Sequence, residues 1–113
     1  MGAPITAARA RYEAALPLYR KVGSVQGEAN CVQGLGDIDE ANKDIASARR
    51  RWSEALALYG RIAEPYSIGF AHRRLARVAA TPAEGAAHRE AARRAWASIG
   101  RADLIAEWLD KGP

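Results

Sequence analysis

The two histidines and the single cysteine are the residues of this chain best suited to hold a metal ion or attack a substrate. His72 and His88 are 16 positions apart, and we find no cysteine or carboxylate that completes a ligand set with them. We therefore expect no metal site, and we place both imidazoles at the rim of a helix pair. Cys31 has no matched histidine partner and lies among small residues, which predicts a buried and unreactive thiol.

Other patterns of catalysis or cofactor binding are missing from the sequence. Serines and carboxylates occur without the spacing of a nucleophile elbow or a catalytic triad. The segment Gly34-Leu35-Gly36 lacks the third glycine and the preceding strand of a phosphate-binding loop. We therefore expect a protein that is not an enzyme and needs no cofactor.

The aromatic residues are spaced as the core of a helical protein. Residues 45–62 place apolar side chains at steps of three and four, which puts them on one stripe of an α-helix. A helix with one apolar stripe must bury it against a neighbouring element. The stripe consists of Ile45, Ala48, Trp52, Ala55, Leu56, Tyr59 and Ile62.

An internal repeat of 40 residues supplies that neighbouring element. Residues 5–22 match residues 45–62 at eight of eighteen positions, and Tyr12 aligns with Trp52. A third copy fits at a shift of 37, where Trp96 takes the place of Tyr59. No segment alternates polar and apolar residues as a half-buried strand does, so the whole chain is expected to be helical.

Capping and turn residues divide the chain into about six helices. Ser24 fits an N-cap, Pro65 fits a first helical position, and Thr81 with Glu84 fits a capping box. The first helix should continue through Pro17, and residues 1–4 are interpreted as linker or cloning residues. The expected helices cover residues 5–22, 25–42, 45–62, 65–80, 82–99 and 102–110.

Composition and charge limit the partners that we consider. Of 113 residues 49% are hydrophobic and 27% are charged, and no apolar run is long enough to span a membrane. The single cysteine and the lack of a signal peptide favour the cytoplasm. Seven arginines between residues 72 and 101 could attract nucleic acid. Aromatic residues do not alternate with these arginines as stacking surfaces require, so we do not expect that partner.

The segment from residue 32 to residue 55 resembles the tetratricopeptide repeat. Leu35-Gly36, a short turn, Ala48, Trp52 and Ala55 follow the order of that family's motif, whereas Asp39 stands where the family usually has tyrosine. The resemblance implies an all-α fold, an α-solenoid of antiparallel helix pairs over residues 5–113. It implies an orphan second helix at 5–22, repeats at 24–62 and 64–99, and a capping helix at 101–111, as in a C-terminal fragment of a longer array.

The resemblance also implies a binding function. In tetratricopeptide folds the first helix of each pair lines a concave groove, so we expect a non-catalytic scaffold that binds a peptide or protein partner there. The implied groove residues lie outside the apolar stripes, and we do not expect packing to account for them. They are Asn30, Gln33, Asp37, Glu40, Phe70, Arg73 and Arg77.

Three alternatives stay open. The groove residues could be plain solvated side chains. The forty-residue repeat is similar to arrays in nucleotide-binding signalling regulators, so the chain could be the sensing arm of a signalling ATPase or transcriptional regulator. Nucleic-acid binding through the Arg-rich helices is the third hypothesis. The helix at 5–22 has no preceding partner helix, so we also expect a homo-oligomer formed through it.

Overall fold

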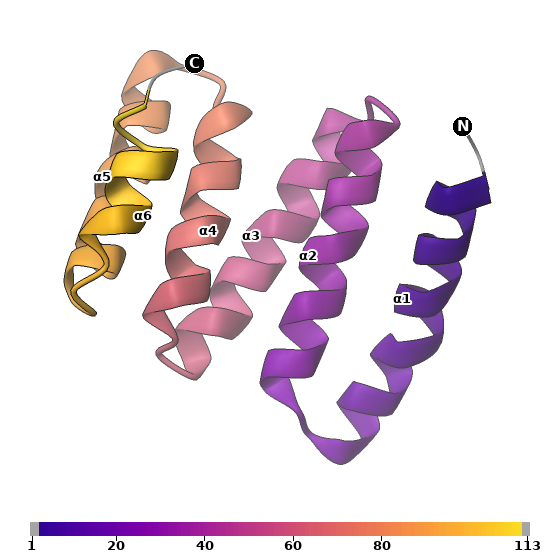
Figure 1. The fold of residues 1–113 in the computed structure, drawn as a ribbon. Coiled ribbons are helices and arrows are strands. Elements are labelled where there is room, and N and C mark those ends of the chain that lie inside the picture. The colour runs from indigo at the N-terminus through magenta and orange to yellow at the C-terminus, as the bar shows by residue number, and fades with distance from the viewer. Residues whose placement is uncertain (1–2, 112–113) are drawn as a thin grey trace. The chain divides into compact units, whose positions relative to one another are not determined.

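The computed structural model describes residues 3–111 and consists of six α-helices (Figure 1). Between residues 3 and 111 there is no strand, so the expected all-α fold of six helices packed in adjacent pairs is confirmed. Of the linker expected at residues 1–4, residues 1 and 2 lie outside the described part, and the first helix already begins at Ala3. The helices are α1 (Ala3–Val22), α2 (Val25–Ala41), α3 (Ile45–Arg61), α4 (Pro65–Arg77), α5 (Pro82–Ala97) and α6 (Ala102–Trp108).

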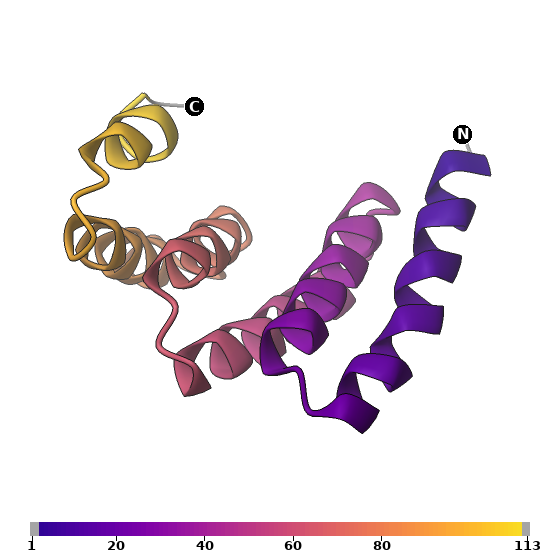
Figure 2. The same cartoon turned by 60° about the horizontal axis from the view of Figure 1, so that its bottom comes forward.

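The helices form two compact units. Unit 1 (Met1–Ile62) contains α1, α2 and α3, and unit 2 (Ala63–Pro113) contains α4, α5 and α6. In unit 1, α2 packs against both α1 and α3; in unit 2, α5 packs against both α4 and α6. Figures 1 and 2 show the helices of each pair running side by side. None of the helices between residues 3 and 111 is both long and apolar enough to cross a membrane.

Side-chain caps fix where the helices begin. The Ser24 hydroxyl accepts a hydrogen bond from the Gly27 N–H at 3.2 Å, and the Asp44 carboxylate accepts one from the Ser47 N–H at 3.2 Å. The Thr81 hydroxyl accepts from the Glu84 N–H at 3.1 Å. The Glu84 carboxylate accepts a hydrogen bond from the Ala80 N–H. In a standard capping box it would accept from the N–H of the N-cap residue, which here is Thr81. Local sequence therefore sets these boundaries.

The largest difference from the expected helix bounds is at the end of α4. Helix α4 ends at Arg77, although the pattern predicts a helix up to residue 80. The N–H groups of Val78 and Ala79 bond to carbonyls three residues back, at Leu75 and Ala76. This tighter spacing ends the α-helix. Elsewhere, α1 continues through Pro17 as predicted.

Tyrosine rings of α1 pack into glycine positions of α2. Tyr19 lies over Gly27 and Tyr12 lies over Gly34, and a Cβ atom at either glycine would stand 2.3 Å from the ring. Because no real Cβ comes so close to its neighbours, only glycine permits this helix spacing. The two helices therefore approach through notches on α2.

Tryptophan rings close the α2–α3 and α4–α5 pairs in the same way. Trp52 of α3 lies over Gly36, and a Cβ there would stand 2.6 Å from its Nε1. Trp96 of α5 lies over Gly69, where the distance would be 2.2 Å. Both tryptophans are completely buried. Each unit thus has one tryptophan seated in a glycine notch.

The two copies of the repeat, residues 5–22 and 45–62, differ in how far their corresponding side chains are buried. Tyr59 of α3 is 1% exposed, and its counterpart Tyr19 of α1 is 38% exposed. Leu58 is 7% exposed, and its counterpart Leu18 is 64% exposed. Helix α1 therefore exposes a strip of apolar side chains, whereas α3 buries the corresponding side chains.

Candidate functional site

Two of the polar residues expected to line a groove on α2, Asn30 and Asp37, accept hydrogen bonds from aromatic side chains of α3. The Tyr59 hydroxyl donates to Asn30 Oδ1 at 2.5 Å, and Trp52 Nε1 donates to Asp37 Oδ1 at 3.0 Å. Trp52 Nε1 also lies 3.3 Å from the backbone oxygen of Gln33. Buried donors require such acceptors. Asn30 and Asp37 therefore make contacts within unit 1, although Asn30 is itself exposed, and their role in a groove stays a prediction.

The end of α2 holds an ion pair that the sequence did not reveal. Asp39 is 5% exposed, and its carboxylate lies 3.2 Å from Arg51 Nε of α3. The aspartate that departs from the tetratricopeptide pattern therefore joins two helices. Glu40, another expected groove residue, is half-buried, and its backbone oxygen accepts from the Lys43 N–H at 2.9 Å. The polar groups at this end of α2 are therefore largely engaged, by the ion pair with Arg51 and by the hydrogen bonds of the turn after the helix.

The groove residues expected on α4 lie in a different setting, beside α6. Phe70 is half-buried between three rings, with centroid distances of 5.1 Å to Tyr66, 4.8 Å to Trp96 and 5.7 Å to Trp108. Phe70, one of the expected groove residues, is only partly exposed because α6 lies against it. Arg77, by contrast, is exposed at the end of α4.

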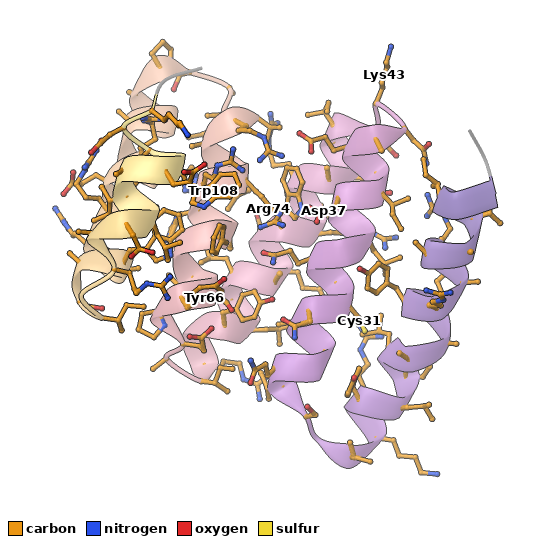
Figure 3. The ribbon with its side chains drawn as sticks, in the orientation of Figure 1. Cys31, Asp37, Lys43, Tyr66, Arg74 and Trp108 are labelled. Carbon is orange, nitrogen blue, oxygen red and sulfur yellow. The ribbon has the colours of Figure 1, made fainter. Side chains whose placement is uncertain are left out.

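The exposed aromatics of unit 2 are Tyr66 and Trp108, both labelled in Figure 3. Tyr66 is 44% exposed and Trp108 is 39% exposed. The Arg73 guanidinium lies 4.4 Å from the centre of a Trp108 ring, and the Arg101 guanidinium lies 5.7 Å from that of Tyr66. We call Tyr66, Phe70, Arg73, Arg101 and Trp108 the α4–α6 aromatic surface. It brings cations and aromatic faces together, although the sequence separates them.

Sequence reasoning placed two members of this surface and missed three. Phe70 and Arg73 were expected at a binding face, whereas Trp108 was noted only as part of the expected capping helix at 101–111. The i, i+4 pair of Tyr66 and Phe70 on one helix was the available signal. Trp108 could not be assigned in the same way, because its exposure depends on how the seven-residue helix α6 docks.

Ion pairs hold α6 in place. Arg93 of α5 donates to Asp110 Oδ1 at 2.9 Å, and Arg89 donates to the Leu109 carbonyl. Arg101 binds both carboxylate oxygens of Asp103, each at 2.9 Å. These hydrogen bonds hold the pKa of the Asp103 and Asp110 carboxyls below their usual range. Both carboxylates are therefore charged at neutral pH. The contacts of Arg89 and Arg93 join the end of α6 to α5, whereas the Arg101–Asp103 pair is local to the start of α6.

Unit 1 contains a pocket of about 480 Å³ between its three helices. Its apolar side is built by Leu16, Pro17, Val32 and Leu35. Glutamates and arginines share its rim, and Arg20 lies 3.1 Å from Glu28 and 3.7 Å from Glu54. The rim carries both signs of charge, three arginines and two glutamates, which points to no single class of ligand.

The residues suited to chemistry occupy two separate places. Cys31 is 4% exposed, as predicted, and burial raises the pKa of its thiol. His72 and His88, which the sequence separates by 16 positions, meet with 2.9 Å between their Nδ1 atoms. Among the residues that the structure describes, no three histidine, cysteine or acidic side chains gather where they could hold a metal ion.

Comparison with known proteins adds no assignment. No protein-family model matches the sequence, and neither the curated proteins nor the solved structures include a match.

Proposed function

We propose that the chain is a non-catalytic binding module of the tetratricopeptide kind that holds an acidic segment of a protein partner on the α4–α6 aromatic surface. The observation that carries the proposal is Arg73 stacked on the partly exposed Trp108, 4.4 Å from the ring centre. A guanidinium beside an aromatic face offers apolar contact and carboxylate pairing within one footprint.

The charge of α4 supports an acidic partner. Between Pro65 and Arg77 this helix carries Arg73, Arg74 and Arg77 and no aspartate or glutamate. Complementary charge increases the rate of encounter and suppresses wrong partners. Tyrosine, tryptophan and arginine are also the residue types that contribute most to binding at protein interfaces. An acidic segment with an apolar side chain would use both properties.

The aromatic surface is preorganised. The Phe70 ring contacts the rings of Tyr66 and Trp108 and packs edge-on against the buried Trp96. Rings held in place lose little conformational freedom when a partner binds. On α2, in contrast, Asn30 and Asp37 are engaged by buried donors. The proposal therefore places binding in unit 2, and it suits both an independent scaffold and the sensing arm of a regulator.

A peptide-display selection tests the proposal. A random peptide library is panned against the full chain, against Tyr66→Ala/Trp108→Ala, and against the control Arg94→Ala, whose charge pairs with Glu90 on α5. We expect the wild type and the control to enrich peptides with acidic residues beside an apolar one. We expect the double variant to enrich none of them. Enrichment of the same peptides by all three proteins would overturn the proposal.

Nucleic acid is the competing outcome, because exposed rings beside arginines also suit stacked bases. A labelled 20-nucleotide oligo-dT serves as the probe. Binding that requires Tyr66 and Trp108 and falls steeply between 50 mM and 200 mM salt would favour nucleic acid. Under the proposal, oligo-dT binds no better to the wild type than to the double variant.

A further inference from the structure

The two histidines of the chain face each other between α4 and α5. His72 Nδ1 and His88 Nδ1 are 2.9 Å apart, the ring centroids are 5.2 Å apart, and the rings are tilted by 40°. The centroid separation is close to the nitrogen separation plus the distance of each nitrogen from its own ring centre. Both nitrogens therefore lie near the line that joins the rings. This is the geometry of a straight N–H···N hydrogen bond.

This arrangement suits a proton better than a metal ion. Two imidazoles that share a metal direct their lone pairs at a third point, whereas these nitrogens point at each other. No third histidine, cysteine or acidic ligand lies close to the pair among residues 3–111. A hydrogen bond requires that one Nδ1 carries the proton and that the other offers its lone pair. The two rings must therefore hold different tautomers.

The hydrogen bond between His72 and His88 limits how many protons the two rings can bind while it is kept. In the neutral pair, one ring has its proton on Nδ1 and the other on Nε2. One further proton goes to the free Nε2 of the donor ring, and the resulting cation still donates to its neutral neighbour, which strengthens the bond. A second proton must go to the accepting Nδ1. Two N–H groups and two positive charges would then face each other at 2.9 Å.

We propose that His72 and His88 form a proton-operated latch between α4 and α5, which is closed until both rings are charged and then opens. The proposal rests on the histidine geometry and is independent of the proposed binding function. The latch has one closed neutral state, one closed singly charged state and one open doubly charged state.

The surroundings of the pair do not offset a second charge. Burial lowers the pKa of His72, and the charge of His88 lowers it further. The nearby arginines point to other partners: Arg73 lies over Trp108, Arg74 donates to the Phe70 carbonyl, and Arg89 donates to the Leu109 carbonyl.

The acidic groups of α5 and α6 are bound elsewhere. Glu84 accepts from the Ala80 N–H, Glu90 pairs with Arg93 and Arg94, Asp103 with Arg101, Glu107 with Lys111, and Asp110 with Arg93.

The sign of the pH dependence follows from these contacts. The folded state favours neutral His72 more than the unfolded state does, so the unfolded chain binds more protons. The stability that depends on neutral His72 is therefore fully present above the ordinary histidine pKa of about 6.5. It is lost as the pH falls from that value through the lower pKa of the folded protein.

Nuclear magnetic resonance of the full chain tests the latch directly, because the chain has only two histidines. The Cε1–H signals are followed from pH 8 to pH 5, and long-range ¹H–¹⁵N spectra identify each tautomer. We expect two separated titration steps, with the lower one well below the ordinary histidine range, and one ring in the Nδ1–H form. Two independent titrations near 6.5, or two Nε2–H rings at pH 8, would overturn the proposal.

Thermal unfolding gives a second readout. Between pH 7.5 and pH 5.5 we expect the Tm of the wild type to fall by about 4 °C or more. The variant His72→Asn/His88→Asn places amides near the Nδ1 positions, cannot titrate, and should show no such fall. Equal pH dependence of both proteins would contradict the latch. If the double variant does not fold, the wild-type spectra alone decide.

Discussion

Trp52 Nε1 donates a hydrogen bond to Asp37 Oδ1 over 3.0 Å, while the same indole ring fills the notch above Gly36. Gly36 and Asp37, which are adjacent on α2, therefore form one socket. The glycine leaves room for the indole ring, and the aspartate accepts the hydrogen bond from its Nε1–H. Trp96 sits over Gly69 in unit 2, and its Nε1 donates to the Tyr66 carbonyl at 3.0 Å. Each tryptophan closes its helix pair by filling a glycine notch and by hydrogen bonding through its Nε1–H.

The socket predicts opposite effects for two substitutions of the same kind. Gly36→Ala should reduce the free energy of unfolding by about 1–3 kcal/mol, because the buried Trp52 ring cannot move away from a new Cβ. Gly60→Ala on α3 meets nothing within 4 Å and should raise it by about 0.5–1 kcal/mol, through the better helix propensity of alanine. Urea denaturation of both variants measures the difference. A stabilising Gly36→Ala would show that the notch does not limit helix approach.

The turn between α3 and α4 predicts a stabilising substitution. Ala63 has a φ of 48°, a left-handed conformation that disfavours any side chain with a Cβ. Ala63→Gly should therefore stabilise the protein by about 0.5–1 kcal/mol. The control Ala57→Gly, at an exposed position inside α3, should destabilise it by about 1 kcal/mol. Both values follow from Tm and urea midpoints, and a loss of stability in both variants would contradict the turn geometry.

Burial of Cys31 predicts slow thiol chemistry. Its side chain is 4% exposed, and burial raises its pKa, so little thiolate is available in the folded protein. Labelling by a disulfide reagent at pH 7.5 should be far slower in the native chain than in 6 M urea. The native rate should also rise with subdenaturing urea, since opening of unit 1 limits it. A native rate equal to that of the unfolded chain would show that the thiol is accessible.

The bare strip on α1 predicts self-association. Leu18 is 64% exposed and Val22 is 74% exposed, whereas the counterpart Leu58 on α3 is 7% exposed. Exposed apolar side chains of this size favour contact with a second copy of the chain. Light scattering should show a concentration-dependent rise in mass for the wild type, and Leu18→Lys/Val22→Lys should abolish the rise. A wild type that stays monomeric at high concentration would contradict this expectation.

The fold follows closely from local sequence signals. Ser24, Asp44 and Thr81 cap helices in the structure, and the apolar stripe over residues 45–62 has Trp52 and Tyr59 fully buried. These features depend on side chains a few residues apart. Periodicity and capping are sensitive to such short spacings.

The candidate site was less predictable, because its contacts join separate helices. Arg73 and Trp108 lie 35 positions apart and meet only through the docking of α6. The contact of His72 with His88 likewise depends on how α4 and α5 align. Asp37 was assigned to a groove because the sequence cannot show that a buried indole needs its carboxylate. Side-chain partners across helices require coordinates.

The most direct test of the proposed function is fluorescence anisotropy with one labelled acidic peptide from the display selection. The peptide is titrated with the wild type, with Arg73→Ala and with the control Arg94→Ala, which removes an equal charge from the exposed side of α5. We predict that Arg73→Ala raises the Kd by about tenfold or more, whereas Arg94→Ala changes it by less than about twofold. Equal Kd values for Arg73→Ala and the wild type would contradict binding at the α4–α6 aromatic surface.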